Sequence, residues 1–151
     1  MFRISTKGRY GTRLMLNLAQ HYQEGAPARS LKDVSDEEDI SIRYLEQIII
    51  PLRVHKIVKS VRGAGGGYTL TKPPAAIKLS DVLQAVEGSC CLVECVDDKS
   101  FCERIPFCPA HEIWKEGTRI MKVYFDSISL KDMIKIAEKK SRRKPRIQKS
   151  L

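Results

Sequence analysis

Residues 41–70 read SIRYLEQIIIPLRVHKIVKSVRGAGGGYTL and join the pattern of an amphipathic helix to that of a β-hairpin. Ser41 is a good N-cap, and the large apolar residues after it recur at helical spacing. Pro51 removes a backbone donor, so we expect a kink near Gln47 or an early end of the helix at Ile50. The β-branched run IVKSV and the segment YTLT flank GAGGG, which predicts two short strands joined by a glycine turn.

Two further helices are predicted upstream of this stretch. Apolar residues at helical spacing follow a capping Ser5 or Thr6 and predict a first helix that ends near Gly25. Ser30 opens a short second helix, and the acidic run SDEED after Val34 is predicted to form the turn. Three short helices followed by a hairpin are the layout of a winged helix-turn-helix. An α/β enzyme would need repeated strand–helix crossovers, and the sequence contains no such pattern.

Downstream of the hairpin, the sequence predicts helices interrupted by a cysteine-rich loop. Ser80 is expected to cap a helix that closes at Gly88, a longer helix starts at Pro109, and a last one starts at Ser129. Apolar residues seven apart in the longer helix favour packing against a second copy of the chain, with cover of its own domain as the alternative. The residues of this pattern are Trp114, Met121 and Ile128, with Tyr124 and Phe125 between them.

The predicted fold is therefore mainly α with a small β-hairpin wing: a winged helix-turn-helix followed by a long dimerisation helix. Four segments follow from this pattern. They are a DNA-binding domain at 1–80, a linker helix and cysteine-rich loop at 81–108, dimerisation helices at 109–138, and a disordered basic tail at 139–151.

Charge restricts the class of protein. The 151 residues carry a formal net charge of +9, and residues 139–151 hold seven Lys or Arg and no acid. This tail is predicted to add nonspecific attraction to nucleic acid, with a solubilising role as the alternative. Basic residues interrupt every apolar window near the start of the chain, so we expect no signal peptide, no membrane span and a cytoplasmic location without a membrane partner.

The third helix and the hairpin carry residues suited to reading DNA. A recognition helix presents polar side chains near its N-terminus; Glu46 can accept from the cytosine amino group, and Arg43 can reach guanine or phosphate. Arg62 precedes the glycines at the wing tip and can enter a narrow minor groove. A solvated helix face and a plain hairpin are the alternatives. The predicted DNA-contacting residues are Arg3, Lys7, Arg9, Ser41, Arg43, Tyr44, Glu46, Gln47, Arg62, Gly63, Gly65, Gly66, Gly67 and Tyr68.

Residues 91–111, CLVECVDDKSFCERIPFCPAH, have the composition of a metal site. An odd number of cysteines without an export signal disfavours a disulfide framework. The gaps between the last three cysteines are wider than in most structural zinc sites, whereas iron–sulfur clusters tolerate them. Pro109 suits the first position of a helix, whose dipole favours a thiolate and a neutral imidazole at its start. The candidate ligands are Cys95, Cys102, Cys108 and His111, with Cys91 as the alternative fourth ligand.

Four segments together resemble successive signatures of the Rrf2 family of bacterial transcription regulators. They are ISTKGRYGTRLMLNLA, YLEQIIIPLR, VKSVRGAGGGYTL and IKLSDVLQAVEG, in the family's order and within residues 2–130. The resemblance implies a homodimeric winged-helix protein that binds double-stranded DNA at promoter operators. IscR-type members bind a 2Fe-2S cluster through three cysteines and a histidine, which this resemblance carries onto Cys95, Cys102, Cys108 and His111, with 4Fe-4S as the alternative.

Two departures from the family pattern bear on these expectations. Lys56 stands where relatives carry glycine, and a left-handed cap is less comfortable for lysine. Six residues separate Cys95 from Cys102 where the IscR pattern has five, and Cys91 is an additional thiol, which leaves the fourth ligand and the cluster type open.

The expected function is transcription regulation by a protein that is not an enzyme. It would sense iron–sulfur status, receive its cluster from assembly proteins, and control iron–sulfur biogenesis or related genes. The alternative is a cluster-free or thiol-redox-sensing regulator of the same family, acting for example in cysteine metabolism or the nitric oxide response. A Cys–His enzyme would need an oriented nucleophile, and the sequence contains no such constellation.

Overall fold

The computed structural model describes residues 3–22 and 28–142. The elements are α1 (Thr6–Gln20), α2 (Leu31–Glu38), α3 (Ile42–Val54), β1 (Val58–Val61), β2 (Gly67–Leu70), α4 (Leu79–Glu87), α5 (Glu94–Asp97), α6 (Pro109–Asp126) and α7 (Leu130–Arg142), with short 3₁₀ turns at Pro74–Ala76 and Ile105–Phe107. β1 and β2 form an antiparallel hairpin in which Val58 pairs with Leu70. The predicted fold, mainly α with a β-hairpin wing, is confirmed.

Serine caps begin the first three helices, as the sequence predicts. Ser5, Ser30 and Ser41 each accept a hydrogen bond from the amide N–H three residues further on, at 3.1 to 3.2 Å. Such a cap satisfies one of the backbone donors that have no partner inside the helix. These three serines therefore fix where α1, α2 and α3 begin.

The end expected for the second helix and one of the two alternatives given for the third are wrong. The acidic run does not form the turn, because α2 continues through Glu38 and the chain turns at Asp39, whose φ is 53°. The third helix does not end at Ile50, because α3 continues through Pro51 to Val54. The proline removes one backbone hydrogen bond, but Leu52 is fully buried in the next turn and holds the end of the helix against the core.

The predicted cap of α4 is also wrong. α4 begins at Leu79, so Ser80 lies inside its first turn, and the N–H of Lys78 donates instead to the Asp81 carboxylate at 3.0 Å. The helix ends at Gly88, as predicted, with a φ of 82°. An acidic side chain at the third helical position can thus replace a serine cap, because it returns to the backbone N–H that precedes the helix.

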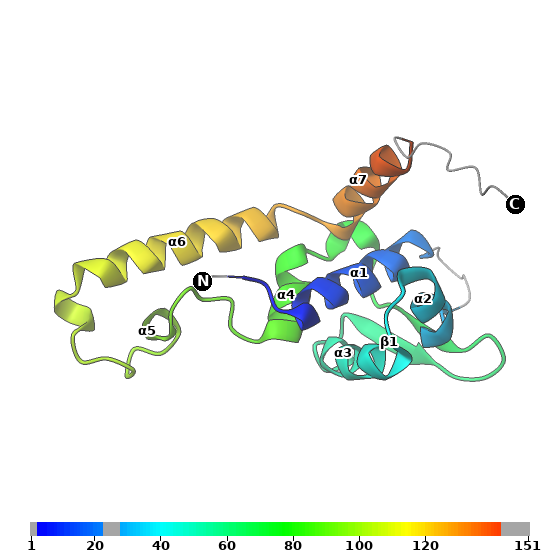
Figure 1. Ribbon diagram of the computed structural model, residues 1–151, viewed down its shortest axis with the longest axis horizontal. Helices are drawn as coiled ribbons and strands as arrows, with labels where there is room; N and C mark the ends of the chain where they lie inside the picture. Colours follow the sequence, from blue (N-terminus) through cyan, green and yellow to red (C-terminus); the bar gives the residue numbers. More distant parts are fainter. Residues whose placement is uncertain (1–2, 23–27, 143–151) are drawn as a thin grey trace, which may run out of the picture.

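α1, α3, α4, the hairpin and the start of α7 share one hydrophobic core and form the body of the molecule (Figure 1). Backbone hydrogen bonds from Leu79 to Ile128 (2.9 Å) and from Leu130 to Ile77 (3.0 Å) hold the junction between α6 and α7 against the start of α4. The fully buried side chains include Leu14, Met15, Leu45, Ile48, Leu52, Val82 and Leu130.

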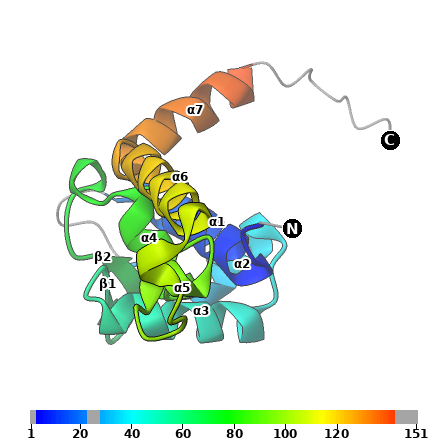
Figure 2. The ribbon, with the colours of Figure 1, turned by 90° about the vertical axis from the view of Figure 1, so that its left-hand side faces the viewer.

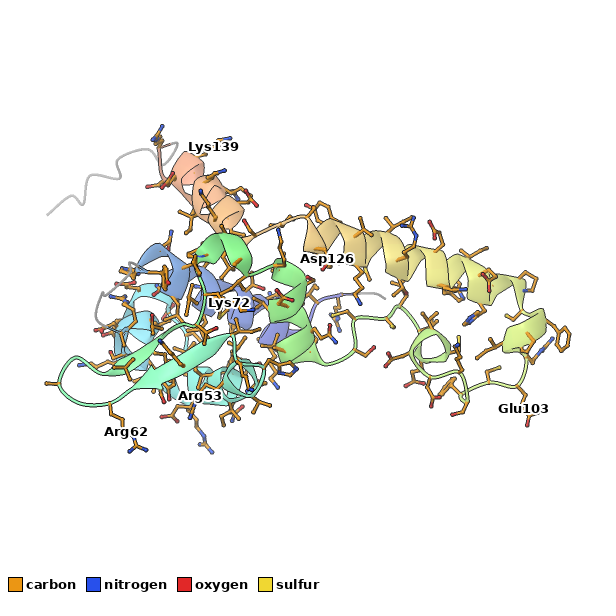
Figure 3. All side chains as sticks on the ribbon, turned by 180° about the vertical axis from the view of Figure 1, so that it is seen from behind. Arg53, Arg62, Lys72, Glu103, Asp126 and Lys139 are labelled. Carbon is orange, nitrogen blue, oxygen red and sulfur yellow. The ribbon has the colours of Figure 1, made fainter. Side chains whose placement is uncertain are left out.

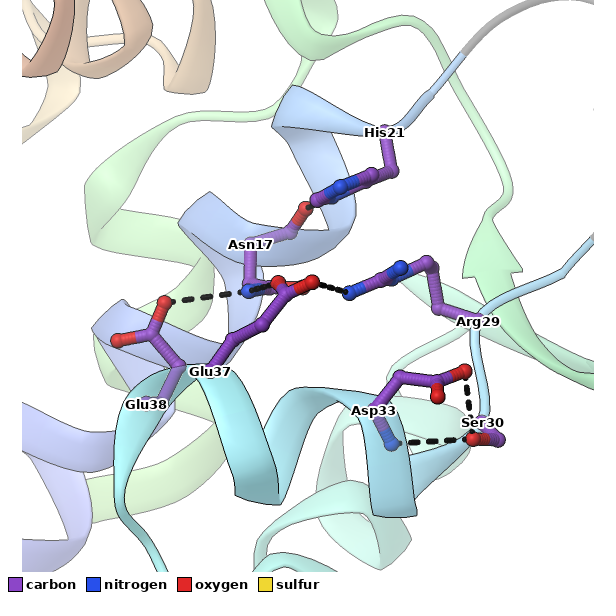
Figure 4. A network of polar contacts seen from close by, with 7 residues as sticks. All are labelled: Asn17, His21, Arg29, Ser30, Asp33, Glu37 and Glu38. Atoms are coloured by element: carbon purple, nitrogen blue, oxygen red, sulfur yellow. Dashed lines mark hydrogen bonds and ion pairs between the residues drawn. The ribbon is translucent and has the colours of Figure 1, made fainter.

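A polar network fixes α2 against α1 (Figure 4). The amide of Asn17, only 2% exposed, donates to Glu37 at 2.8 Å and to Glu38 at 3.1 Å. The Arg29 guanidinium lies 2.6 Å from the second oxygen of Glu37. The hydrogen bond from Asn17, together with Arg29, lowers the pKa of the Glu37 carboxyl. The acidic run expected as a turn therefore positions the helix that precedes α3.

α6 projects from the body as an arm, with α5 beside its N-terminal half (Figures 1 and 2). Residues 89–129 are all described, and none of their hydrophobic side chains is buried. Gly117 lets Leu92 approach α6 closely.

The sequence predicted that the heptad residues of α6 lie on one packing face. The structure divides them between a half-buried and an exposed face. Met121, Phe125 and Ile128 are half-buried toward the body, whereas the most exposed apolar residues of α6 are Ile113, Ile120, Val123 and Tyr124.

The end of α7 overlaps the segment that the sequence assigns to a disordered tail. α7 continues through Arg142, and the basic residues of its last turn favour a helix because they face the negative end of its dipole. The rest of that segment, residues 143–151, lies outside the described residues. The first helix ends at Gln20, so the end expected near Gly25 is wrong.

Candidate nucleic-acid interface and cysteine site

α3 has one buried and one exposed face. The face toward the core consists of Leu45, Ile48, Ile49 and Leu52. The predicted base-reading residues Arg43, Glu46 and Gln47 lie together on the exposed face, after the exposed cap Ser41. At about 3.6 residues per turn, positions three, four and seven apart stay on one side of the helix. The structure thus brings four of the predicted contacts together on an accessible surface.

Two tyrosines of the predicted set are engaged in packing. The Tyr44 ring meets Tyr10 edge to face, with centroids 5.5 Å apart and an interplanar angle of 85°. The backbone of Tyr68 pairs with Arg29 through hydrogen bonds of 2.8 and 2.9 Å, so the segment before α2 adds to the edge of β2. Both side chains are half-buried against the core. Their clearest roles are therefore structural.

The glycine turn of the hairpin is explained by backbone geometry alone. Gly63 and Gly65 have φ values of 98° and 74°, and a Cβ at Gly67 would overlap the carbonyl oxygen of Arg29. Several positions of the turn therefore disfavour or exclude a side chain, and the hairpin itself accounts for its glycines. Arg62 is exposed before the turn, and it points to the same side of the molecule as Arg53 of α3 (Figure 3).

The N-terminus of α1 is tied to the end of α4. The N–H and the hydroxyl of Ser5 both donate to the same oxygen of Glu87, at 3.0 and 2.6 Å. This places Arg3 and Arg9, which are exposed, and the half-buried Lys7 around the start of the helix. A negative side chain at a helix N-terminus also interacts favourably with the helix dipole.

Sequence reasoning missed a basic groove between α3 and β1. The groove has a volume of about 670 Å³, and Ile50, Arg53, Val54, Lys56 and Lys59 are among the residues that line it. The signal was present, because Ile50 and Val54 follow Arg43 and Gln47 at helical spacing. Lys56 adopts a φ of 56°, so lysine takes the left-handed conformation that favours glycine at this position.

The cysteine loop holds free thiols that the structure does not gather around one point. All five cysteines are half-buried and unpaired. Within the described residues, no three His, Cys, Asp or Glu side chains are placed to hold one metal ion. Cys108 and His111 lie in the first turn of α6, where the backbone N–H of His111 donates to the backbone carbonyl of Cys108 at 3.2 Å. The structure therefore places two of the predicted ligands in one helical turn, and among the described residues it does not gather the predicted set around one point.

His111 is the most enclosed of the predicted ligands. It is 8% exposed, and its Nδ1 atom has no hydrogen-bond partner among the described residues. A buried polar atom without a partner is costly, so a missing partner is expected there. Three free thiols, the alternative Cys91 thiol and this imidazole form a donor set that fits an iron–sulfur cluster.

Cys90 is the one cysteine outside the predicted donor set, and it lines the same cavity as its neighbour Cys91. This cavity of about 380 Å³ lies where the start of α1, the end of α4 and α6 meet. Burial raises the pKa of the Cys90 thiol, and the Glu87 charge adds to this shift. Because the thiolate is the metal ligand, the raised pKa disfavours Cys90 as a ligand.

The helical body, the exposed polar face of α3 and the hairpin define a winged-helix DNA-binding protein. The family model "Rrf2: Iron-dependent Transcriptional regulator" matches residues 4–136. The chain therefore belongs to the Rrf2 family of DNA-binding transcription regulators.

Relatives with solved structures have the same fold. The chain resembles the structure of IscR from T. potens with a TM-score of 0.76 and 36% identity, over 95% of this chain and 94% of that one. It resembles the structure of CymR, the global cysteine regulator of B. subtilis, with a TM-score of 0.73 and 37% identity, over 90% and 98%.

A relative known from its sequence has a similar extent. The transcriptional regulator IscR of Xenorhabdus nematophila is 37% identical over 136 residues, which are 90% of this chain and 81% of the relative. In the described part of this chain, no helix has the length and apolar character needed to cross a membrane.

Proposed function

We propose that this regulator is a homodimer that binds promoter operators and reports iron–sulfur status through a cluster held by Cys95, Cys102, Cys108 and His111. The cluster is 2Fe-2S in this proposal, with 4Fe-4S and Cys91 as the alternatives. Assembly proteins donate it, and the regulated genes serve iron–sulfur biogenesis or related processes. The observation that carries the proposal is the buried Nδ1 of His111, one helical turn after Cys108, which has no hydrogen-bond partner among the described residues and lies in a segment that buries no hydrophobic side chain.

DNA binding in this proposal divides between reading and positioning. Arg43, Glu46 and Gln47 on the exposed face of α3 read base edges in the major groove, and Arg62 enters the adjacent minor groove. Arg3, Lys7 and Arg9 at the start of α1 contact phosphates. Phosphate contacts fix the register of the protein on the duplex without selecting the sequence.

The exposed stripe of α6 supports the homodimer. Ile113, Ile120 and Tyr124 follow one another at spacings of seven and four residues, and each is more than half exposed. An arm that carries such a stripe away from its own core gains by packing against a symmetry-related copy. Two recognition helices would then face two half-sites on the DNA.

Glu87 supports a connection between the cysteine loop and the DNA-binding residues. It ends α4 three residues before Cys90, and it accepts both hydrogen bonds from Ser5 at the start of α1. A bound cluster would supply iron–thiolate bonds that order the loop. A change in the loop can then alter the position of Glu87, and with it that of Arg3 and Lys7. A difference of about 1.4 kcal/mol between the two states would change DNA affinity tenfold.

A cluster-free or thiol-redox regulator is the second candidate. It is favoured by the absence of a gathered ligand set among the described residues and by the five free thiols. The likeness to CymR supports an assignment to cysteine metabolism in that case. Oxidation would then act on thiols that the first proposal assigns to the cluster.

The two candidates are separated by metal analysis of protein purified without oxygen. We expect a coloured protein that contains equal iron and acid-labile sulfide, and loss of both in Cys95→Ala and Cys102→Ala. Cys91→Ala and His111→Ala identify the fourth ligand, and Cys90→Ala is the matched control that keeps its iron. A protein that stays colourless after reconstitution with iron and sulfide would contradict the cluster and leave the thiol regulator.

The DNA-binding part of the proposal has its own test. Duplexes selected from a random pool by holo and apo protein should differ in affinity or sequence. Arg62→Ala should weaken binding to the selected duplex by about 1–3 kcal/mol if the arginine reads the minor groove. Equal binding of holo and apo protein to every selected duplex would contradict the sensor mechanism.

A further inference from the structure

We infer that α3 also recognises thymine, through two apolar side chains, Ile50 and Val54, that meet the 5-methyl group of the base. This inference rests on the proposed DNA binding and adds a sequence preference to it. Ile50 is 58% exposed and Val54 is 71% exposed, although both belong to a helix whose other large aliphatic residues are mostly buried.

The position of these two residues on the helix is the first argument. Ile50 follows Arg43 by seven residues and Glu46 by four, and Val54 follows Gln47 by seven. These spacings place them on the face that carries the polar base-reading residues. Single exposed apolar residues are common and need no explanation. Two of them, one turn apart in the C-terminal half of α3, extend the recognition face with a small apolar surface.

The charge around the pair is the second argument. Ile50 and Val54 line the groove between α3 and β1 together with Arg53, Lys56 and Lys59. The described residues that line this groove include no acid. The basic side chains of this surface can bind a polyanion, and the apolar patch between them can contact an apolar group on that polyanion. An ordinary protein partner would require acidic residues facing these cations.

The chemistry of DNA identifies that apolar group. In the major groove, bases present hydrogen-bond donors and acceptors, and the methyl group of thymine is the apolar feature. Aliphatic side chains contact this methyl group, while lysine and arginine at the rim contact the phosphates of the same strand. The groove therefore selects thymine at the base pairs that Ile50 and Val54 face.

The test removes the methyl group from the DNA instead of the side chain from the protein. After a duplex has been selected with the full chain, each thymine is replaced in turn by deoxyuridine, which pairs identically and lacks only the 5-methyl group. We expect one or two positions in each half-site to weaken binding about threefold to tenfold, since burying a methyl-sized group contributes about 0.8 kcal/mol. Ile50→Ala or Val54→Ala should weaken binding to the thymine duplex by a similar factor. The variant should no longer distinguish thymine from deoxyuridine.

Ile136→Ala is the matched control, because Ile136 is an isoleucine of similar exposure (52%) on α7. It should retain the full discrimination between thymine and deoxyuridine. The inference is overturned, with the regulator intact, if no deoxyuridine substitution weakens binding or if the discrimination persists in both Ile50→Ala and Val54→Ala. It is also overturned if these two variants bind DNA normally and lose self-association instead. Failure to select any duplex would remove the proposed DNA binding itself.

Discussion

The body of the molecule and its arm use the same kinds of residues in different ways. In the body, Leu14, Leu45 and Val82 come from three helices and are fully buried against one another. In the arm, residues 89–129, Ile113 and Ile120 are more than half exposed, and the buried side chains are His111, Thr118 and Ser129. The body is stabilised by its own hydrophobic core, whereas the arm buries no hydrophobic side chain.

This difference indicates two kinds of partner for the arm. Its exposed aliphatic stripe is suited to a second copy of the chain, and its thiols and imidazole are suited to a metal cluster. In the proposed function both would be added to the arm, so the arm could respond to conditions without loss of the fold of the body. Such a sensor would keep the folding stability of its DNA-binding body independent of whether the cluster is bound.

The largest effect is expected from a cavity in the body. Leu45→Ala should lower the free energy of unfolding by about 2–5 kcal/mol, because Leu45 is completely buried and its removal leaves a void. Ile113→Ala in the arm, measured by urea unfolding at a concentration where the protein is monomeric, should change it by less than about 0.5 kcal/mol. Similar losses for the two variants would contradict the distinction between body and arm.

The next effect concerns the exposed stripe of α6. Ile120→Glu should weaken self-association by about 1.5–3 kcal/mol for each side chain that the dimer would bury, without unfolding the monomer. Lys115→Glu is the control, because Lys115 is an exposed α6 residue on the other side of the helix. Sedimentation equilibrium measures both. Unchanged association of Ile120→Glu would remove α6 from the dimer interface.

A smaller effect is expected at the connection between the two regions. Glu87→Ala should lower the free energy of unfolding by about 1–2 kcal/mol, because the N–H and hydroxyl of Ser5 lose their shared acceptor. Glu87→Gln keeps an acceptor oxygen and should lose less than half as much. If Glu87 couples the regions, Glu87→Ala should also reduce the difference in DNA affinity between holo and apo protein. An undiminished difference would place the coupling elsewhere.

The smallest effect is expected at Lys56, where one substitution should stabilise the fold and weaken DNA binding. Lys56→Gly should raise the free energy of unfolding by about 0.5–1 kcal/mol, because glycine accepts the left-handed conformation without strain. The same change should weaken DNA binding and reduce the slope of log K against log salt by about one, since one cation leaves the groove. Anisotropy titrations at several salt concentrations test the second part. An unchanged slope would mean that Lys56 does not contact phosphate.

Much of the body could be predicted from sequence because its signals are local. Serine caps and apolar periodicity located α1, α2 and α3, and the glycine-rich turn located the hairpin. The errors arose where tertiary contacts prevail over local preference. Glu37 remains helical because Asn17 and Arg29 bind it, and α3 passes Pro51 because the following turn is packed.

The candidate sites were less predictable. Helical spacing was enough to place Arg43, Glu46 and Gln47 on one surface, but it did not show that Tyr44 packs against Tyr10. The groove between α3 and β1 joins residues from two elements, which no single pattern reveals. The spacing of the cysteines indicated donors for a cluster, but it did not show that the described structure leaves these donors ungathered.

Hydrogen exchange before and after anaerobic cluster reconstitution tests most directly whether a ligand completes the arm. The amides of α1, α3 and α4 should be protected equally in both forms. Those of residues 91–108 should exchange rapidly without iron and become protected when iron and sulfide are bound. Equal protection of residues 91–108 in both forms, with iron demonstrably bound in one of them, would contradict the account.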